Sequence, residues 1–142
     1  MANADPTFNL PAGTCRVVRS GEAYQGKQGL TYLRGLTGET AGSTSICMTV
    51  LTLPNGARAK THLHQGVETA VYVIDGRAEM YFGDRLGDHV EVAAGDYLYI
   101  PADVPHLVMN RSGAPATALV AHSAASDQEG IVLLPDLDPL IS

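Results

Sequence analysis

Two histidines and a glutamate lie close together near the middle of the chain, at spacings that suit a metal site. His62 and His64 are two positions apart, so on a β-strand both side chains project from one face, with Cα atoms roughly 6.5–7 Å apart. Two imidazoles placed in this way can converge on one ion. Glu68 follows after a short segment whose glycine suits a turn. A carboxylate is therefore expected to join the two imidazoles.

Short apolar or alternating segments, separated by glycine and proline, make up most of the chain. They are rich in Val, Ile, Tyr and Thr, which favours many short strands in an antiparallel sandwich or a closed barrel. The clearest hairpin signal is Asp75-Gly76. The expected strands are 15–18, 46–53, 70–74, 78–82, 97–100, 107–109, 118–121 and 131–134.

The two histidines belong to the first of two patterned segments. The first is Gly56-x5-His62-x-His64-x3-Glu68-x7-Gly76, and the second is Gly95-x5-Pro101-x-Asp103-x2-His106-x3-Asn110. Together they resemble the paired motifs of the cupin superfamily of small β-barrels. The resemblance implies an all-β fold, the cupin-type double-stranded β-helix or jelly-roll barrel.

The sequence departs from the cupin pattern at two positions. Asp103 stands where the second motif usually has glycine, and we expect a positive φ there, which Asp tolerates better than most residues. In the first motif, one extra residue separates Glu68 from Gly76. We interpret the extra residue as tolerated, because Glu68 keeps its spacing from the two histidines.

The resemblance implies that one divalent metal is bound inside the barrel by His62, His64, Glu68 and His106. Three neutral imidazoles and one carboxylate suit a transition metal (Fe, Mn, Co, Ni, Cu or Zn), whereas calcium and magnesium sites are built mainly from oxygens. An octahedral ion with four protein ligands would keep two open positions for water, dioxygen or a chelating substrate.

Three further residues are candidates for contact with a substrate. If the strand through the first motif is regular, Arg58 and Lys60 share the face of the two histidines and would favour an anionic substrate; alternatively, both reach water at the rim. Tyr72 shares the face of Glu68, where it could donate a hydrogen bond to a ligand or lie in the core. His122 lies on an expected strand, but the sequence does not show which way it points.

Composition limits the partners and the location. Nine Lys+Arg against fifteen Asp+Glu give a formal net charge of −6, so no basic surface is expected to bind nucleic acid. No apolar run approaches the roughly 18–20 residues of a membrane span, and no export signal is recognisable at the start. We therefore expect a cytoplasmic protein with no membrane partner and with free thiols at Cys15 and Cys47.

The length predicts a single cupin domain over residues 1–142. The first motif occupies 56–76 and the second 95–110, and segments 1–13 and 128–142 are expected to be peripheral. The apolar segment 131–135 favours a homodimer; the alternative is that it covers its own barrel.

Three functions remain open. The leading hypothesis is a mononuclear metal-dependent oxidoreductase, similar to a dioxygenase, that acts on a small oxygenated or aromatic molecule. A metal-dependent isomerase, epimerase or lyase is the alternative, and it would need a second titratable group beside the metal, for which His122, Lys60 and Tyr72 are candidates. The third is a non-catalytic cupin that binds a metal and a small molecule.

Overall fold

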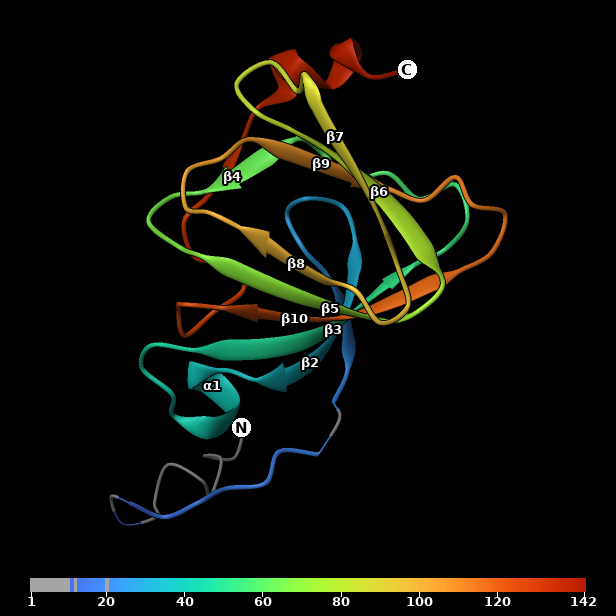
Figure 1. Ribbon diagram of the computed structural model, residues 1–142. Coiled ribbons are helices and arrows are strands. Elements are labelled where there is room, and N and C mark those ends of the chain that lie inside the picture. Colours follow the sequence, from blue (N-terminus) through green and yellow to red (C-terminus); the bar gives the residue numbers. More distant parts are fainter. Residues whose placement is uncertain (1–10, 12, 20) are drawn as a thin grey trace.

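The computed structural model describes residues 11, 13–19 and 21–142, which form two antiparallel sheets facing each other (Figure 1). One sheet has the order β1-β2-β3-β10-β5-β8, with strands Ala23–Gln25, Thr31–Leu36, Cys47–Leu53, Ala116–His122, Thr69–Asp75 and Tyr97–Ile100. The other has the order β11-β4-β9-β6-β7, with strands Ile131–Leu133, His62–His64, His106–Met109, Arg77–Phe82 and Asp88–Ala93. The predicted all-β jelly-roll fold is confirmed.

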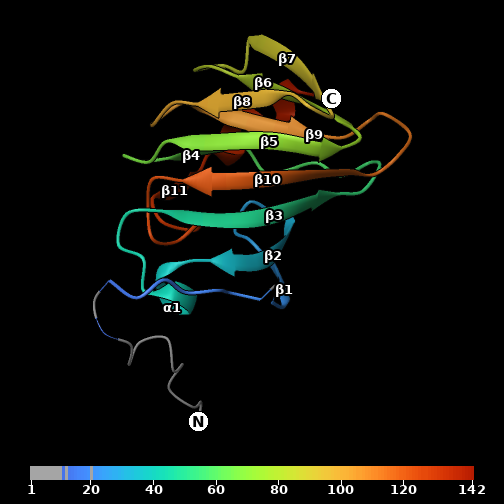
Figure 2. The ribbon, with the colours of Figure 1, turned by 60° about the horizontal axis from the view of Figure 1, so that its bottom comes forward.

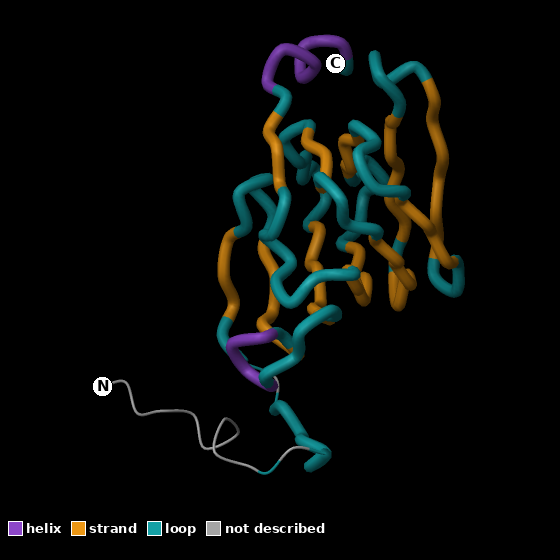
Figure 3. The backbone as a smooth tube through the Cα atoms, turned by 90° about the vertical axis from the view of Figure 1, so that its left-hand side faces the viewer, coloured by secondary structure: helices purple, strands orange, loops and turns teal. Residues whose placement is uncertain are grey.

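Figure 2 shows β8, β5, β10, β3 and β2 of the six-stranded sheet side by side. Two short helices, α1 (Gly38–Ala41) and η2 (Pro135–Leu140), lie at opposite ends of the molecule (Figure 3). Neither they nor any other helix in the described ranges is long and apolar enough to cross a membrane. Both cysteines are free, Cys15 exposed and Cys47 buried.

Most expected strands are present, but several assignments are corrected. The segment 15–18 is not a strand, and β1, β2 and β7 were not expected. Asp75-Gly76 does not close a hairpin, because β5 pairs with β10 and β8 while β6 pairs with β7 and β9. It is instead a corner between the sheets. Gly76 has φ +82°, and a Cβ there would lie 2.4 Å from the carbonyl oxygen of Pro115, so the corner requires glycine.

The interior is built by alternation along the central strands. In β10, buried positions alternate with half-buried ones, so Ala116, Ala118, Val120 and His122 form the inward row. Leu51 and Leu53 of β3 are in the same core cluster as the first three. Burying side chains of this kind stabilises the fold by roughly 1.5–3 kcal/mol for each large aliphatic residue. This inward row ends at the polar side chain of His122, next to the candidate metal centre described below.

The C-terminal segment is part of the barrel. β11 pairs with β4, with Ile131 opposite His64 and Leu133 opposite His62. The Arg58 guanidinium donates to the carbonyl oxygens of Asp138 and Ile141 and so fastens the η2 end to the barrel. The expected peripheral segment 128–142 therefore packs on its own barrel, and the homodimer stays a prediction. Nearly all of the other expected peripheral segment, 1–13, lies outside the described residues.

Candidate metal centre

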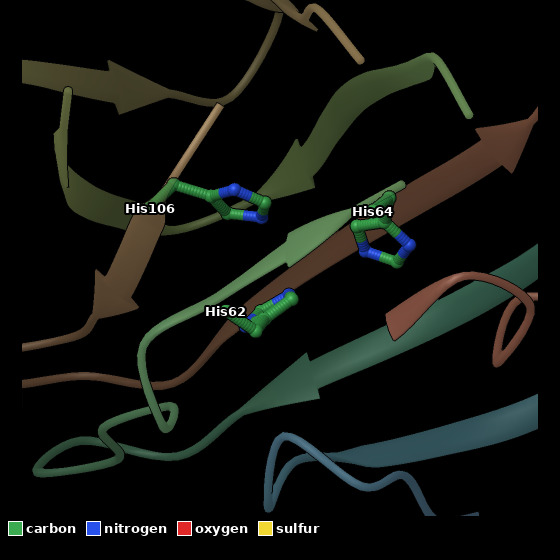
Figure 4. A group of neighbouring side chains, drawn as sticks. All are labelled: His62, His64 and His106. Atoms are coloured by element: carbon green, nitrogen blue, oxygen red, sulfur yellow. The ribbon is translucent and has the colours of Figure 1, made fainter. Parts of the chain in front are cut away.

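Three buried histidines from neighbouring strands converge inside the barrel (Figure 4). His62 and His64 come from β4, and His106 of β9 is directly opposite His62 in the register. The ring centroids are 4.3 Å apart for His62 and His106, 5.1 Å for His62 and His64, and 5.8 Å for His64 and His106. One nitrogen from each ring lies within 4.8 Å of the others. These three imidazoles could bind a metal ion.

Hydrogen bonds orient two of the rings. Nδ1 of His62 lies 2.8 Å from the carbonyl oxygen of Lys60, and Nδ1 of His106 lies 2.9 Å from that of Val104. A carbonyl oxygen only accepts, so each Nδ1–H donates and each Nε2 keeps its lone pair. Nδ1 of His64 is buried and has no hydrogen-bond partner among the described residues. A buried nitrogen without a partner is costly, and an ion bound to this nitrogen would remove the cost, so the residues fit a metal.

Burial also keeps the three imidazoles neutral, the form that binds metal. Burial is the main cause that lowers the pKa of His62 to about 4, and that of His64 and His106 to about 3. The neighbouring imidazoles, including that of His122, lower these pKa values further. At neutral pH the site therefore presents lone pairs rather than protons.

The structure does not bring Glu68 to the histidines. Its side chain is exposed and accepts a hydrogen bond from the Tyr99 hydroxyl, at 2.6 Å, on the outside of the barrel. The next residue, Thr69, is buried and lines the interior beside the histidines. The prediction that Glu68 ligates the metal is therefore corrected.

Glu68 was assigned to the wrong face of its strand because the register of β5 differs by one residue from the one expected. In β5, Thr69, Val71 and Val73 line the interior, so Glu68 and Tyr72 belong to the outward row. Counting back from Gly76 without the extra residue places Thr69, not Glu68, at the carboxylate position of the motif. A shift of one residue moves a strand side chain to the opposite face, so the extra residue is not a tolerated insertion.

The three predicted substrate-contacting residues also lie away from the cavity. Tyr72 packs on Tyr97, with ring centroids 4.8 Å apart, on the outer face of the six-stranded sheet. Arg58 is engaged with the C-terminal segment, and Lys60 is exposed. Strand alternation did not apply before His62, because β4 begins there and both Thr61 and His62 are buried. Neither cation lines the cavity, so Arg58 and Lys60 give no support for an anionic substrate.

His122 is the residue that the sequence left undecided. It is buried at the end of β10, its ring centroid lies 4.7 Å from that of His64, and its Nδ1 lies 2.8 Å from Oγ1 of Thr69. Burial lowers its pKa as well. In the stretch before it, Leu119 and Ala121 of one row are as apolar as Ala118 and Val120 of the other, so the sequence alone could not give its direction.

Two residues of the second motif hold the turns around the site. Asp103 has φ 67°, which confirms the positive φ expected there. Its carboxylate accepts from the backbone N–H of Gly66 at 3.0 Å, and its own N–H donates to the carbonyl of His64 at 3.0 Å. Asn110 is fully buried, and its amide donates to the carbonyls of Leu53 and Ala114. Both residues are therefore structural.

The histidines open into a cavity of about 80 Å³ inside the barrel. A water molecule needs roughly 10–15 Å³ on this measure, so the cavity is large enough for a small molecule. Most of its wall is aliphatic, with Leu51, Met80 and Val108 among the lining residues. Among the described residues that line it, the only titratable side chains are Tyr32 and the four histidines. The site thus combines a polar end that could bind a metal with an apolar chamber.

The chain belongs to the cupin family, because a family model described as a cupin domain matches residues 49–122. This stretch begins in β3 and ends at His122, and it includes the three converging histidines. It confirms the resemblance drawn from the two motifs. No protein with curated annotation matches the sequence.

Solved structures share the fold at low sequence identity. Oxalate decarboxylase OxdC from Bacillus subtilis has a TM-score of 0.65 and 22% identity, over 80% of this chain and 30% of that one. Polyketide cyclase RemF from Streptomyces resistomycificus has 0.63 and 22%, over 82% and 76%. DMSP lyase DddQ from Ruegeria pomeroyi has 0.54 and 24%, over 64% and 44%. The chain thus spans about a third of the decarboxylase and under half of the lyase.

Proposed function

We propose that this cupin is a mononuclear metal-dependent oxidoreductase of the dioxygenase type, acting on a small oxygenated or aromatic molecule. The observation that carries the proposal is the cluster His62, His64 and His106 at the end of a mainly apolar cavity. A bound divalent transition metal would supply a Lewis acid and, if redox-active, reactivity toward dioxygen. In such chemistry the main roles of the protein are to hold the metal and to orient the substrate.

The chamber supplies that orientation and excludes water. Its aliphatic walls suit the apolar part of a small substrate, so that an oxygen atom of the molecule faces the histidines. Tyr32 and Gln28 add a polar pair on the wall, where the Gln28 amide donates to the Tyr32 hydroxyl. Burial is the main cause that raises the pKa of Tyr32 well above its usual value, so this hydroxyl stays protonated and acts as a hydrogen-bonding group.

The alternative is a non-redox lyase or isomerase, and His122 is the observation that favours it. A reaction of this kind needs a base beside the metal, and His122 is a neutral imidazole in the cavity wall. The solved neighbours named as a decarboxylase, a lyase and a cyclase support keeping this second candidate. A base role requires that His122 is not itself bound to the metal.

Elemental analysis followed by dioxygen uptake separates the candidates. The purified protein should contain about one transition-metal ion per chain, and it should consume dioxygen with at least one member of a panel of catechols, enediols and 2-oxo acids. His106→Ala should lose metal and uptake, whereas His89→Ala should keep both, because His89 is on the outer strand β7, bonded to Glu79. Metal-dependent turnover of the same panel without dioxygen consumption would overturn the proposal in favour of the lyase or isomerase.

A further inference from the structure

The six-stranded sheet contributes a fourth imidazole to a cluster that otherwise comes from the five-stranded sheet. His122 ends β10 and is opposite Thr69 of β5 in the register. Its ring centroid is 4.7 Å from that of His64, closer than the 5.1 Å between His64 and His62. Imidazoles from both sheets therefore lie next to each other at this end of the barrel.

The two ring nitrogens of His122 have different surroundings. Nδ1 lies 2.8 Å from Oγ1 of Thr69, a hydroxyl that can donate or accept. When Nδ1 carries the proton and donates to this oxygen, Nε2 keeps its lone pair and can bind an ion. His62 and His106 have the same arrangement: Nδ1–H donates to a backbone carbonyl, and Nε2 keeps its lone pair. Such a hydrogen bond behind a ring is typical of metal-bound histidines.

No carboxylate is placed to complete the metal site. Glu68 is exposed and bonded to Tyr99, and no Asp or Glu lines the cavity in the described part of the chain. Thr69 takes the inward position, but its hydroxyl is within hydrogen-bond distance of His122. The inward position that the motif reserves for a ligand is thus used to orient a histidine.

We propose that His122 is the fourth protein ligand, so that one metal ion is held by four imidazoles and no carboxylate, with Thr69 as the positioning residue. The inference rests on the proposed metal site but not on the kind of reaction. Four neutral ligands leave the full formal charge of +2 on a divalent ion, and imidazoles suit zinc, copper, nickel or iron better than manganese. His122 would then not be free to act as a base.

The ligand count can be read directly from the wild-type protein. The full chain, labelled with 15N in its histidine rings and loaded with zinc, contains five histidines whose nitrogen shifts distinguish a metal-bound nitrogen from a protonated or free one. We expect four residues with a metal-bound nitrogen and only His89 without one. His122→Gln and His89→Gln assign the two decisive signals. A metal-bound set limited to His62, His64 and His106 would overturn the inference.

Zinc affinity, measured by competition with a chromophoric chelator, gives a second readout. His122→Ala should weaken binding by more than about 100-fold, whereas Thr69→Val, which removes only the hydrogen bond behind the ring, should fall within the roughly 10–100-fold range of outer-shell changes. Glu68→Gln is the matched control and should change affinity by less than about 2-fold, within the scatter expected of an exposed residue. Weaker binding in Glu68→Gln, with His122→Ala unaffected, would restore the carboxylate as ligand.

The outcomes separate this inference from the proposed function. A wild-type protein that binds no zinc contradicts both. Zinc bound by three histidines refutes only the fourth ligand and leaves His122 available as the base of a lyase or isomerase. If His122→Ala does not fold, the wild-type nitrogen shifts still decide the question, because they need no variant.

Discussion

The buried histidines should make the metal-free protein unusually sensitive to mild acid. In the unfolded chain, a histidine is protonated below its ordinary pKa of 6.5, whereas in the folded protein the pKa is about 4 for His62 and about 3 for His64 and His106. Between these values the unfolded state binds more protons, so the free energy of unfolding falls as the pH falls below 6.5. Above that pH, neither state is protonated and the effect is absent.

The expected size follows from these pKa values. Between about pH 7 and pH 5.5, each neutral buried histidine lowers the free energy of unfolding by about 1.2 kcal/mol, so three lower it by about 4 kcal/mol. This is a large share of the roughly 5–15 kcal/mol that stabilises an ordinary domain. Glu79, whose pKa is lowered from 4.5 to about 2 chiefly by a hydrogen bond from Arg111, contributes its effect mainly at lower pH.

Urea denaturation of the chelator-treated protein, followed by circular dichroism at the two pH values, measures this directly. His62→Gln and His106→Gln should each remove about 1.2 kcal/mol of the pH dependence, because the substituted residue no longer binds a proton when the chain unfolds. Equal stability of the wild-type protein at both pH values would refute the reasoning, since it would mean that the folded state accepts the protons and the rings are not buried from water.

Three other predictions follow from positions outside the metal site. Arg58→Ala should lower the free energy of unfolding by about 1–3 kcal/mol, through lost contacts to the C-terminal segment, and leave carboxylate binding unchanged in calorimetry. Gly76→Ala should lower the free energy of unfolding by about 1–3 kcal/mol more than Gly95→Ala does. Both glycines have a positive φ, but only a Cβ at Gly76 would clash with backbone atoms. Equal melting temperatures of the two variants would contradict this prediction. Light scattering should give twice 14.9 kDa, since Tyr97 and Tyr99 expose aromatic surface on the outer sheet.

The sequence predicted the part of the site that depends on local spacing. His62 and His64 share a face because they are two apart on one strand, and that relation holds in any strand pairing. The place of Glu68 depended instead on where β5 begins relative to Gly76, and an error of one residue reverses the face. Arg58 and Lys60 were misplaced because the regular strand was assumed to extend before His62.

His122 shows a second limit of what can be predicted from the sequence. One row of β10 contains Ala118 and Val120, and the other contains Leu119 and Ala121. When both faces of a strand are apolar, alternation does not tell which one faces the interior. Only the pairing of β10 between β3 and β5 places His122 in the barrel. The position of this ring is therefore a property of the folded sheet and not of its own segment.

The number of ligands would also determine which parts of the barrel a bound metal stabilises. His62, His64 and His106 all belong to the five-stranded sheet, so an ion held by these three alone would link β4 to β9 and leave the other sheet unaffected. A fourth bond from His122 would link the ion to β10 of the six-stranded sheet. Hydrogen exchange of the backbone amides, compared with and without zinc, distinguishes the two cases. We expect zinc to slow exchange in β10 and β5 as well as in β4 and β9, because opening either sheet would break a metal bond. Protection confined to β4 and β9 would show that the metal does not join the sheets, and that His122 stands beside the site without binding to it.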